Sequence, residues 1–420
     1  MFDRIRFLLN RLGERLWVRP LLICLLSIAA AFLASAADDT GLDRYVPDIS
    51  PESIETLLSI ISSSMLVIAT LAVTSMVSAY ASASNTATPR SFTLIVADDV
   101  SQNALSTFIG VFIFSIVALI ALKTGLYEKS GRFALFVLTL MAFTLVIATF
   151  VRWVDRIARL GRMVATIQKV EAATASALRH RRSVPRLGGI PAGLQQAQGQ
   201  PVYSGQVGYV QRVDVAALQG CAEKLHIRIT VAALPGTFVV PRRPLAYVTA
   251  DSGSPSAVDM ASIADAFLIG TERTFDEDPR FGLIVLSEIA SRAMSPAVND
   301  PGTAIDVIGR FVRLFVLWSE PAAAGEVQPP ECDRVSVPEL SVRDLFDDAF
   351  NAIARDGAGV VEVAMRLQKA LAALAPLGDA AMLDAAMRHS RLALARAEQA
   401  LVIPEDVEAV RELARGVGPA

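Results

Sequence analysis

The stretch ALSTFIGVFIFSIVALIALKTGL, residues 104–126, decides the fold of this chain. Its one charged side chain, Lys123, stands near the end. The length is close to the ~20 apolar residues with which a helix crosses ~30 Å of hydrocarbon. A bilayer interior offers no water to backbone amides, so a segment that enters it must satisfy its hydrogen bonds internally, as an α-helix does. We therefore predict a transmembrane helix here.

Three further runs of the same kind lie in the first part of the chain, and almost none follows residue 155. They cover residues 20–37, 54–80 and 133–154. In a chain of 420 residues with 53% hydrophobic residues, this distribution predicts a membrane protein with a four-helix transmembrane α domain over residues 1–178. A large soluble part follows it. The pattern excludes a soluble enzyme.

The placement of charge predicts the orientation of the spans. Basic residues flank the first and last runs: Arg4, Arg6, Arg11, Arg15 and Arg19 on one side, and Arg152, Arg156, Arg159, Arg162 and Lys169 on the other. The segment between the first two runs is acidic, with Asp38, Asp39, Asp43, Asp48 and Glu52 against Arg44. Since Lys and Arg collect in cytoplasmic loops, we expect both termini in the cytoplasm. The net charge of −3 gives no reason to expect a nucleic-acid partner.

The first run also admits a second interpretation. Its basic start, its apolar middle and the small residues Ala34-Ser35-Ala36 are typical of a secretory signal with a cleavage site. The basic region and the apolar stretch are both long for a signal, which favours a retained span. Cleavage would leave three spans, with the soluble part still inside the cell.

Two connecting segments have a mixed composition. Residues 81–103 are too polar to cross lipid and too apolar for a solvated loop, so either the flanking helices extend and pack there or an interfacial element forms. Residues 179–201 carry Arg181, Arg182 and Arg186 with several glycines and prolines. This composition cannot bury a core, and we predict a basic linker that lies near anionic headgroups or is simply solvated.

The soluble part is predicted to be a cytoplasmic α+β domain in two sections. Residues 202–260 form a small β-rich module, a twisted sheet or partial barrel, with strands at 202–213, 227–231, 238–240 and 245–249 and one helix at 215–224 capped by Asp214. Residues 261–420 form an α-helical region, with helices at 279–294, 301–318, 339–355, 360–375, 379–400 and 404–416. Asp278-Pro279 and Asp300-Pro301 begin the first two of these, and residues 322–336 are expected to be an exposed connector.

A longer motif supports a family resemblance. Phe267, Gly270, Arg273-Thr274, Asp278 and Phe281-Gly282 precede the run IASRAMSPAVNDPGTA at residues 289–304. This pattern, with Gly208-Tyr209, Pro235-Gly236 and Pro244-Leu245 before it, resembles the bacterial predicted membrane proteins catalogued as domain of unknown function 2254. The resemblance covers nearly the whole chain and implies an inner-membrane protein. It implies no activity and no catalytic residues.

The second span holds the first candidate site. At about 100° per residue, Ser59, Ser62, Ser63, Thr70, Thr74 and Ser78 gather on one side of the helix. Such a hydroxyl stripe can line a hydrated ion pathway. The same small side chains also serve close helix packing, which is the more frequent role. The middle of the spans lacks Asp, Glu, Lys and Arg, which argues against a proton-coupled pump and is compatible with a passive channel.

The second candidate site is the segment MSPAVNDPGTA, residues 294–304. Asn299, Asp300 and Thr303 offer oxygen ligands at a helix start whose free amides can hold an anion. Arg273 of the family motif completes this candidate ligand set. The alternative is a tight interhelical turn with an Asx cap, and it is favoured.

Catalytic and metal chemistry find little support in the sequence. His180, His226 and His389 and the three cysteines stand in unrelated contexts, and we expect no metal and no cofactor. The acidic run Glu272, Asp276, Glu277 and Asp278 lacks the spacing of a calcium loop and is expected to be a solvated charged turn. We expect that the protein is not an enzyme.

Two functional hypotheses follow from these observations. The first is a homo-oligomeric ion channel or pore, lined by Ser59, Ser63, Thr70, Thr74 and Ser78 and carrying a cytoplasmic gating or vestibule domain. The alternative is a membrane anchor for a cytoplasmic ligand-binding or scaffolding module. The expected partners are the lipid bilayer, further copies of the chain and an unidentified small ion or ligand.

Overall fold

A computed structural model describes residues 17–40, 43, 45–86, 88–91, 93–94, 99–157, 162–193, 199–250, 260–320 and 329–418. The chain divides into two compact units, Met1–Thr166 and Ile167–Ala420. The division follows Thr166, within the helix after the fourth apolar run, and lies 12 residues before the predicted boundary at residue 178. Each unit is described by itself below.

The described part of the first unit contains four long apolar helices. They are α2 (Val18–Leu33), α3 (Pro51–Thr86), α5 (Asp99–Lys123) and α6 (Lys129–Ile157), with the short 3-10 segments η1 (Ser35–Thr40) and η3 (Pro89–Ser91). Each of the four α-helices has the length and apolar composition to cross a membrane, which confirms the four spans predicted from the sequence. In the segment between the second and third spans α3 continues to Thr86, and residues 87, 92 and 95–98 lie outside the described structure.

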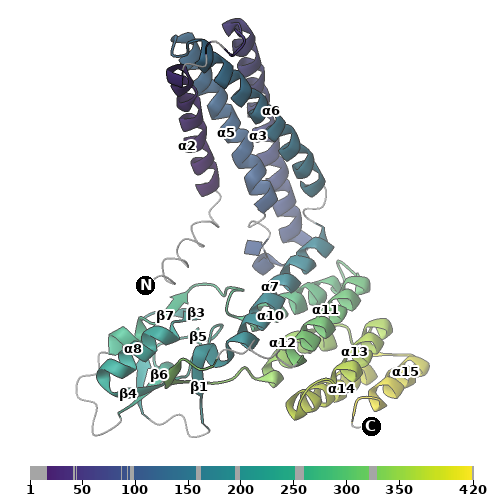
Figure 1. Ribbon diagram of the computed structural model, residues 1–420. Coiled ribbons are helices and arrows are strands. Elements are labelled where there is room, and N and C mark those ends of the chain that lie inside the picture. Colours follow the sequence, from purple (N-terminus) through teal and green to yellow (C-terminus); the bar gives the residue numbers. More distant parts are fainter. Residues whose placement is uncertain are drawn as a thin grey trace. The chain divides into compact units, whose positions relative to one another are not determined.

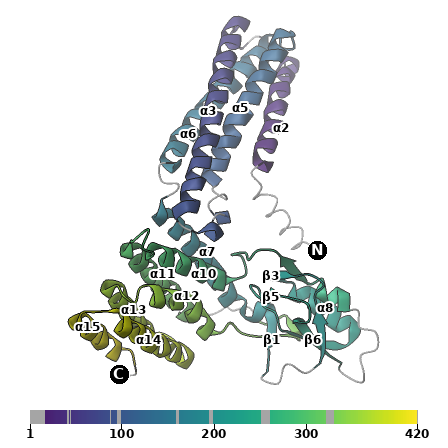
Figure 2. The same cartoon turned by 180° about the vertical axis from the view of Figure 1, so that it is seen from behind.

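The helix α5 forms the centre of this unit. It packs on α2, α3 and α6, and Figures 1 and 2 show it between α2 and α3 from both sides. Phe108 of α5 is fully buried and contacts the rings of Phe150 and Trp153 on α6. Gly110 permits the close approach of α2, because a Cβ atom there would meet the Ile23 side chain at 2.3 Å. Small residues at such crossings let helices pack closely in lipid.

The acidic segment after α2 ties that helix to the start of α6. The Asp38 carboxylate accepts hydrogen bonds from the backbone amides of Glu128 at 3.0 Å and Gly131 at 2.5 Å. A carboxylate at a helix N-terminus satisfies amides that have no partner in the helix and is favoured by the helix dipole. The Tyr127 hydroxyl donates to the Ala31 carbonyl oxygen at 2.7 Å. These contacts fix the α2 end against α6.

Two β-sheets lie within the described residues of the second unit. A five-stranded sheet has the order β1 (Gly189–Pro191), β8 (Cys332–Val337), β4 (Ile227–Val231), β6 (Pro244–Ala250) and β2 (Gln200–Tyr203). In this sheet β8 lies between β1 and β4 and is parallel to both. The strand β6 lies between β4 and β2 and is antiparallel to both. A three-stranded antiparallel sheet has β3 (Gly208–Val213) between β5 (Phe238–Val239) and β7 (Phe267–Gly270). The helices α8 (Val215–Leu225) and α9 (Met260–Ala264) accompany them.

Four assignments from the sequence need correction here. The predicted strand at 202–213 is two strands, β2 and β3, that belong to different sheets. Residues 179–201, predicted as a linker, contain the end of α7 (Met163–Ser183) and the strand β1. The strand β8 lies in the predicted connector at 322–336, and the strand β7 lies in the predicted helical region after residue 261. Short strands such as these are stabilised by distant pairing, for example Gly189 with Cys332, and their local composition does not show it.

The remaining elements are helices that stack on one another away from the sheets (Figure 1). They are α10 (Pro279–Ala293), α11 (Pro301–Ser319), α12 (Val342–Asp356), α13 (Val361–Leu374), α14 (Ala380–Ala400) and α15 (Pro404–Arg415), at the positions predicted from the sequence. The predicted caps are also present, since Asp278 and Asp300 accept hydrogen bonds from the third following amide. Phe315, Phe346 and Phe350 pack ring against ring in the core between α11 and α12.

Two glycines give a matched test of this packing. A Cβ at Gly282 in α10 would lie 1.9 Å from the Thr174 hydroxyl of α7, whereas a Cβ at Gly220 in α8 would meet nothing within 4 Å. We expect Gly282→Ala to lower the free energy of unfolding of the second unit by about 1–3 kcal/mol through overpacking. Gly220→Ala should raise it by about 0.5–1 kcal/mol, because alanine favours a helix interior. Urea titration in detergent measures both, followed by the fluorescence of Trp318 in a chain whose Trp17 and Trp153 are replaced by phenylalanine.

The native chain is the reference for both variants. A neutral or stabilising effect of Gly282→Ala would show that α7 and α10 are not in contact at this point. A destabilising effect of Gly220→Ala would contradict the open surroundings of α8.

Candidate functional site

The hydroxyl stripe of α3 lies on the side of the helix that faces away from its own bundle. The residues that pack inside the first unit, such as Leu58, Met65 and Ala72, share one face. At about 100° per residue, Ser59, Ser63, Thr70, Thr74 and Ser78 lie on the opposite face, and all five are exposed in the single chain. Ser62, grouped with them from the sequence, is instead buried on the packing face. The stripe therefore cannot line a pathway inside one protomer.

Three hydroxyl groups of the stripe donate hydrogen bonds to their own helix. Ser63 donates to the Ser59 carbonyl oxygen at 2.8 Å, Thr70 to that of Val67 at 2.8 Å, and Thr74 to that of Thr70 at 2.9 Å. Because a hydroxyl donates one hydrogen bond and keeps acceptor capacity, each oxygen can still accept a bond from water or from another chain. The face is thus compatible with lipid, with a second copy and with a hydrated ion.

The second predicted site is a structured turn between α10 and α11. Asp300 caps α11, with its carboxylate accepting from the Thr303 amide at 3.1 Å and from the Thr303 hydroxyl at 2.6 Å. Asn299 has the left-handed φ of 50°, and its amide donates to the Ser295 carbonyl oxygen at 2.9 Å. The oxygens of Asp300 and Thr303 are therefore engaged in reversing the chain, although Asn299 and Asp300 are exposed.

Arg273 makes its contacts elsewhere in the unit. Its Nε donates to the Asp278 carboxylate at 2.7 Å, and its guanidinium lies 5.3 Å from the centre of the Phe281 ring. Of the predicted ligand set, the structure brings Asp300 and Thr303 together. Arg273 instead belongs with Asp278 and the Gly236 turn.

That turn borders a cavity of about 330 Å³, here called the arginine pocket. Its charged lining residues are Arg243, Arg273, Arg280, Glu339 and Asp344, and the Pro235-Gly236 turn and the start of α12 complete it. Gly236 has φ +90°, and a Cβ there would lie 2.3 Å from the Asp278 carboxylate. A glycine is required at this point because of both the conformation and the space. Several residues that carry the family resemblance thus meet at one pocket.

The charges of the arginine pocket are only partly paired. Arg280 contacts Asp344 at 2.8 Å and Asp348 at 2.6 Å; burial lowers the pKa of Arg280, but the two carboxylates outweigh burial and raise it. Glu339 pairs with Arg186 at 2.5 Å. Arg243 donates to the Phe238 carbonyl oxygen at 3.0 Å, and no carboxylate in the described part of the chain pairs with it. The carboxylates are therefore neutralised, and Arg243 keeps a positive charge for an anion.

A buried charge cluster, formed by Arg181, Arg212 and Glu277, was missed from the sequence. Arg181 of α7 is 5% exposed, and neither terminal guanidinium nitrogen has a hydrogen-bond partner among the described residues. The Arg212 Nε of β3 lies 3.2 Å from a Glu277 carboxylate oxygen. Burial raises the pKa of Glu277 to about 7 against the lowering effect of Arg212 and Arg181.

The cluster corrects two expectations. Arg181 was assigned to a solvated or headgroup-bound linker, and Glu277 and Asp278 to a solvated turn, whereas all three are buried or nearly so. In the sequence, Phe275 and Phe281 were the sign that these charged residues are buried, because they flank the acidic run. In the structure the centres of their rings are 4.6 Å apart. Aromatic residues on both sides of charged ones indicate that the segment enters a core. No metal-binding group of His, Cys, Asp and Glu occurs among the described residues.

These features define the class of protein: four apolar membrane-spanning helices joined to an α+β unit with internal charge networks. The chain belongs to the family described as predicted membrane protein DUF2254, whose family model matches residues 13–373. This confirms the resemblance seen in the sequence. The family description assigns no function.

Three curated proteins are similar over a shorter part. They are the uncharacterized proteins Mb1321c of Mycobacterium bovis and Rv1290c and MT1328 of Mycobacterium tuberculosis. Each is 34% identical over 116 residues, which is 27% of this chain and 22% of the relative. The match thus spans about a fifth of the length of these relatives. No solved structure shows a significant match to the chain.

The pKa of Glu277 predicts a specific pH dependence of stability. The folded protein keeps the Glu277 proton up to about pH 7, whereas the unfolded chain loses it near the ordinary value of 4.5. This stabilising contribution is therefore complete below pH 4.5 and is lost as the pH rises through 7. We expect the free energy of unfolding of the native chain to fall by about 3 kcal/mol between these limits, and that of Glu277→Gln to change little. Urea titration at pH 5 and pH 8 measures the difference.

Glu272→Gln is the control, because Glu272 is exposed and lies in the same segment. The comparison of variants is needed because His389, whose pKa burial lowers to about 4, gives the opposite slope below pH 6.5. An identical pH profile in the native chain and Glu277→Gln would mean that Glu277 does not titrate in this range.

Proposed function

We propose that this protein is a homo-oligomeric ion channel or pore of the bacterial inner membrane, with its pathway between copies of α3. The observation that carries the proposal is the exposure of the hydroxyl stripe on the face of α3 opposite its packing face. Both termini and the α+β unit lie in the cytoplasm, in accordance with the basic residues that flank the first and last spans. The protein is not an enzyme in this proposal.

The spacing of the stripe supports association through α3. Ser59 and Ser63 are four residues apart, as are Thr70, Thr74 and Ser78. Small residues at this spacing let the backbones of two transmembrane helices come close. Large apolar residues beside the stripe, such as Val67 and Val77, are exposed in the single chain and would pack between copies or against lipid.

The stripe also has the chemistry of a cation or water pathway. Hydroxyl oxygens whose protons are donated to the helix present lone pairs outward, and such oxygens can replace part of the hydration shell of an ion. The carboxylates of α3, Glu52 and Glu55, stand at one end of the helix. Without an ionisable group halfway along α3, conduction would be passive.

The α+β unit supplies the regulatory part of the proposal. Its arginine pocket and its buried charge cluster give it groups that respond to an anion or to pH. A cytoplasmic domain of this kind serves as a gate or vestibule for the pore.

The proposal predicts that flux depends on the stripe. In liposomes that contain the purified protein, cation flux should fall by about tenfold or more in Thr74→Leu, because a leucine removes the oxygen and fills the pathway. The matched control is Thr144→Leu in α6, since Thr144 is also exposed and also donates to its own helix, at 2.9 Å to Leu140.

Assembly is measured in the same samples. A single cysteine at Thr70, in a chain without its native cysteines, should form disulfide-linked dimers in membranes, and a cysteine at Thr144 should not. Flux that is unchanged by Thr74→Leu, or a preparation that is silent and monomeric, would overturn the pore.

A second candidate function is a membrane-anchored ligand-binding module, and the arginine pocket favours it. Arg243 and the terminal guanidinium nitrogens of Arg273 suit an anionic group such as a phosphate or carboxylate.

This candidate predicts binding of a simple anion. Inorganic phosphate should bind the purified protein, and Arg243→Ala should raise its Kd about tenfold, because a charge-assisted hydrogen bond contributes ~1.5–3 kcal/mol. Isothermal titration calorimetry measures the binding. Arg179→Ala, at an exposed arginine of α7 outside the pocket, is the control. Equal binding by all three proteins would exclude the pocket as an anion site.

A further inference from the structure

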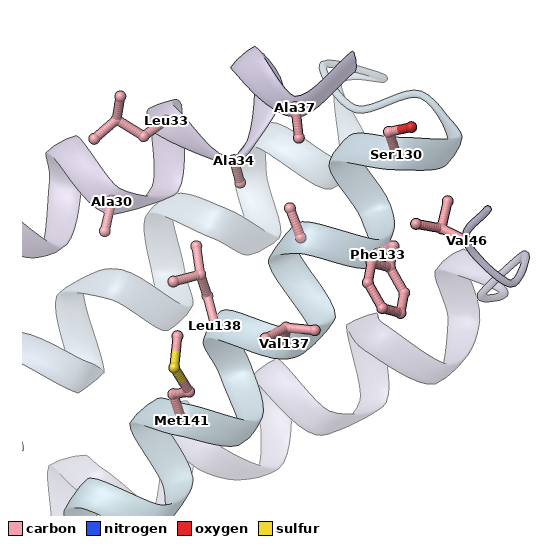
Figure 3. A pocket seen from close by; sticks show the side chains of 11 residues that line it. Ala30, Leu33, Ala34, Ala37, Val46, Ser130, Phe133, Val137, Leu138 and Met141 are labelled. Carbon is pink, nitrogen blue, oxygen red and sulfur yellow. The ribbon is translucent and has the colours of Figure 1, made fainter. Parts of the chain in front are cut away.

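An apolar groove runs along the first unit between α2 and α6. Both helices pack on α5 but scarcely on each other, and η1 contacts both at one end. Farther from η1, Thr107, Val111 and Phe114 of α5 line the groove. Figure 3 shows the end nearest η1, with Ala34 and Ala37 on one side and Val137 and Leu138 on the other. This part has a volume of about 460 Å³ and is lined by Ala30, Leu33, Ala34, Ala37, Val46, Ser130, Phe133, Ala134, Val137, Leu138 and Met141.

A second cavity of about 310 Å³ continues the first. It shares Ala30, Leu138 and Met141 with it and extends to Ile23 and Leu145. Together they form one channel-shaped depression, here called the α2–α6 groove. The groove exists because α2 and η1 present alanines where larger side chains would fill the space.

The size of the groove selects its occupant. From Ser130 to Leu145 it follows α6 for ~22 Å at 1.5 Å per residue, which is more than the ~15 Å of hydrocarbon in one leaflet. Over this length the two cavities hold about 460 and 310 Å³. A single hydrocarbon chain has the length and the narrow section required.

The surroundings supply that chain directly. A void among apolar side chains loses dispersion contacts on every wall, and the adjacent solvent of these helices is lipid. The polar lining groups are few, and the Ser130 hydroxyl is already bonded to the Asp43 carboxylate at 2.5 Å. The Ser130 hydroxyl therefore keeps its hydrogen bond when a hydrocarbon chain occupies the groove.

The charged groups at the η1 end indicate the headgroup. Lys129 donates to the Asp43 carbonyl oxygen at 2.8 Å, and within the described ranges no carboxylate pairs with it, so its charge is available to a phosphate. Two carboxylates lie next to it in the structure: that of Asp38 accepts from the Glu128 and Gly131 amides, and that of Asp43 accepts from the Ser130 hydroxyl. Such a site repels a net negative lipid and attracts an ammonium group beside the phosphate.

We propose that the α2–α6 groove binds one acyl chain of a zwitterionic aminophospholipid, with the phosphate at Lys129 and the ammonium among the neighbouring carboxylates. The site belongs to the leaflet on the side of the α2–α3 connection. It is separate from the hydroxyl stripe of α3 and does not depend on the proposed pore.

The test is the lipid that stays with the protein. After reconstitution into nanodiscs of phosphatidylethanolamine and phosphatidylglycerol in equal amounts and extraction into mild detergent, native mass spectrometry should find about one phosphatidylethanolamine per protomer. In Ala30→Phe, which fills the middle of the groove, this retention should fall at least fivefold. Ala29→Phe is the matched control, because Ala29 is exposed and outside the groove.

Each outcome decides the proposal. Retention in the native chain and Ala29→Phe, with loss in Ala30→Phe, supports it. A native chain that keeps no lipid overturns it, as does equal retention in Ala30→Phe. Preferential retention of phosphatidylglycerol overturns the assignment of the headgroup. The result from the native chain stands even if Ala30→Phe fails to fold.

Discussion

The hydrocarbon interior of a membrane offers no hydrogen-bond partner, and the first unit is organised by that constraint. Its four spans must be helices, and they must then be held together by shape, because lipid is as apolar as their side chains. The central helix α5 provides the shape: Gly110 admits α2, and Phe108 fills the space toward α6. With α5 in the middle, α3 keeps an outward face and α2 and α6 remain apart. The hydroxyl stripe and the α2–α6 groove are both consequences of this arrangement.

The second unit follows a different rule, since it buries charge as well as apolar surface. Arg181, Glu277 and Asp278 lie where water scarcely reaches, and burial of charge is costly unless it is paired. The Arg273–Asp278 pair is packed against Gly236 and Phe281, which fixes its geometry. The buried charge cluster is less complete, because the end of Arg181 lacks a partner in the described structure. Such networks favour one arrangement of the elements. Gain or loss of a proton, or the binding of an anion, changes the charges within them.

The sequence predicted the elements whose signals are local and missed those that depend on distant pairing. Apolar runs of membrane length predicted the spans, and Asp-Pro pairs predicted the starts of α10 and α11. The strands β1 and β8 could not be predicted, since each is short and is stabilised by the other. For the candidate sites, periodicity placed the hydroxyls on one face of α3 but could not tell which face packs. Arg273 was known from its motif, but its neighbours Gly236 and Asp278 meet it only in the fold.

The internal hydrogen bonds of the α3 hydroxyls have a consequence for assembly. Since Ser63, Thr70 and Thr74 already donate to their own helix, the stripe carries little penalty when it faces lipid. A protomer with this face uncovered is then a stable species in the membrane. In the proposed oligomer, association through such a face obeys mass action in two dimensions, and the fraction assembled follows the surface density of the protein. The amount of protein that a cell inserts would itself set how many complexes exist.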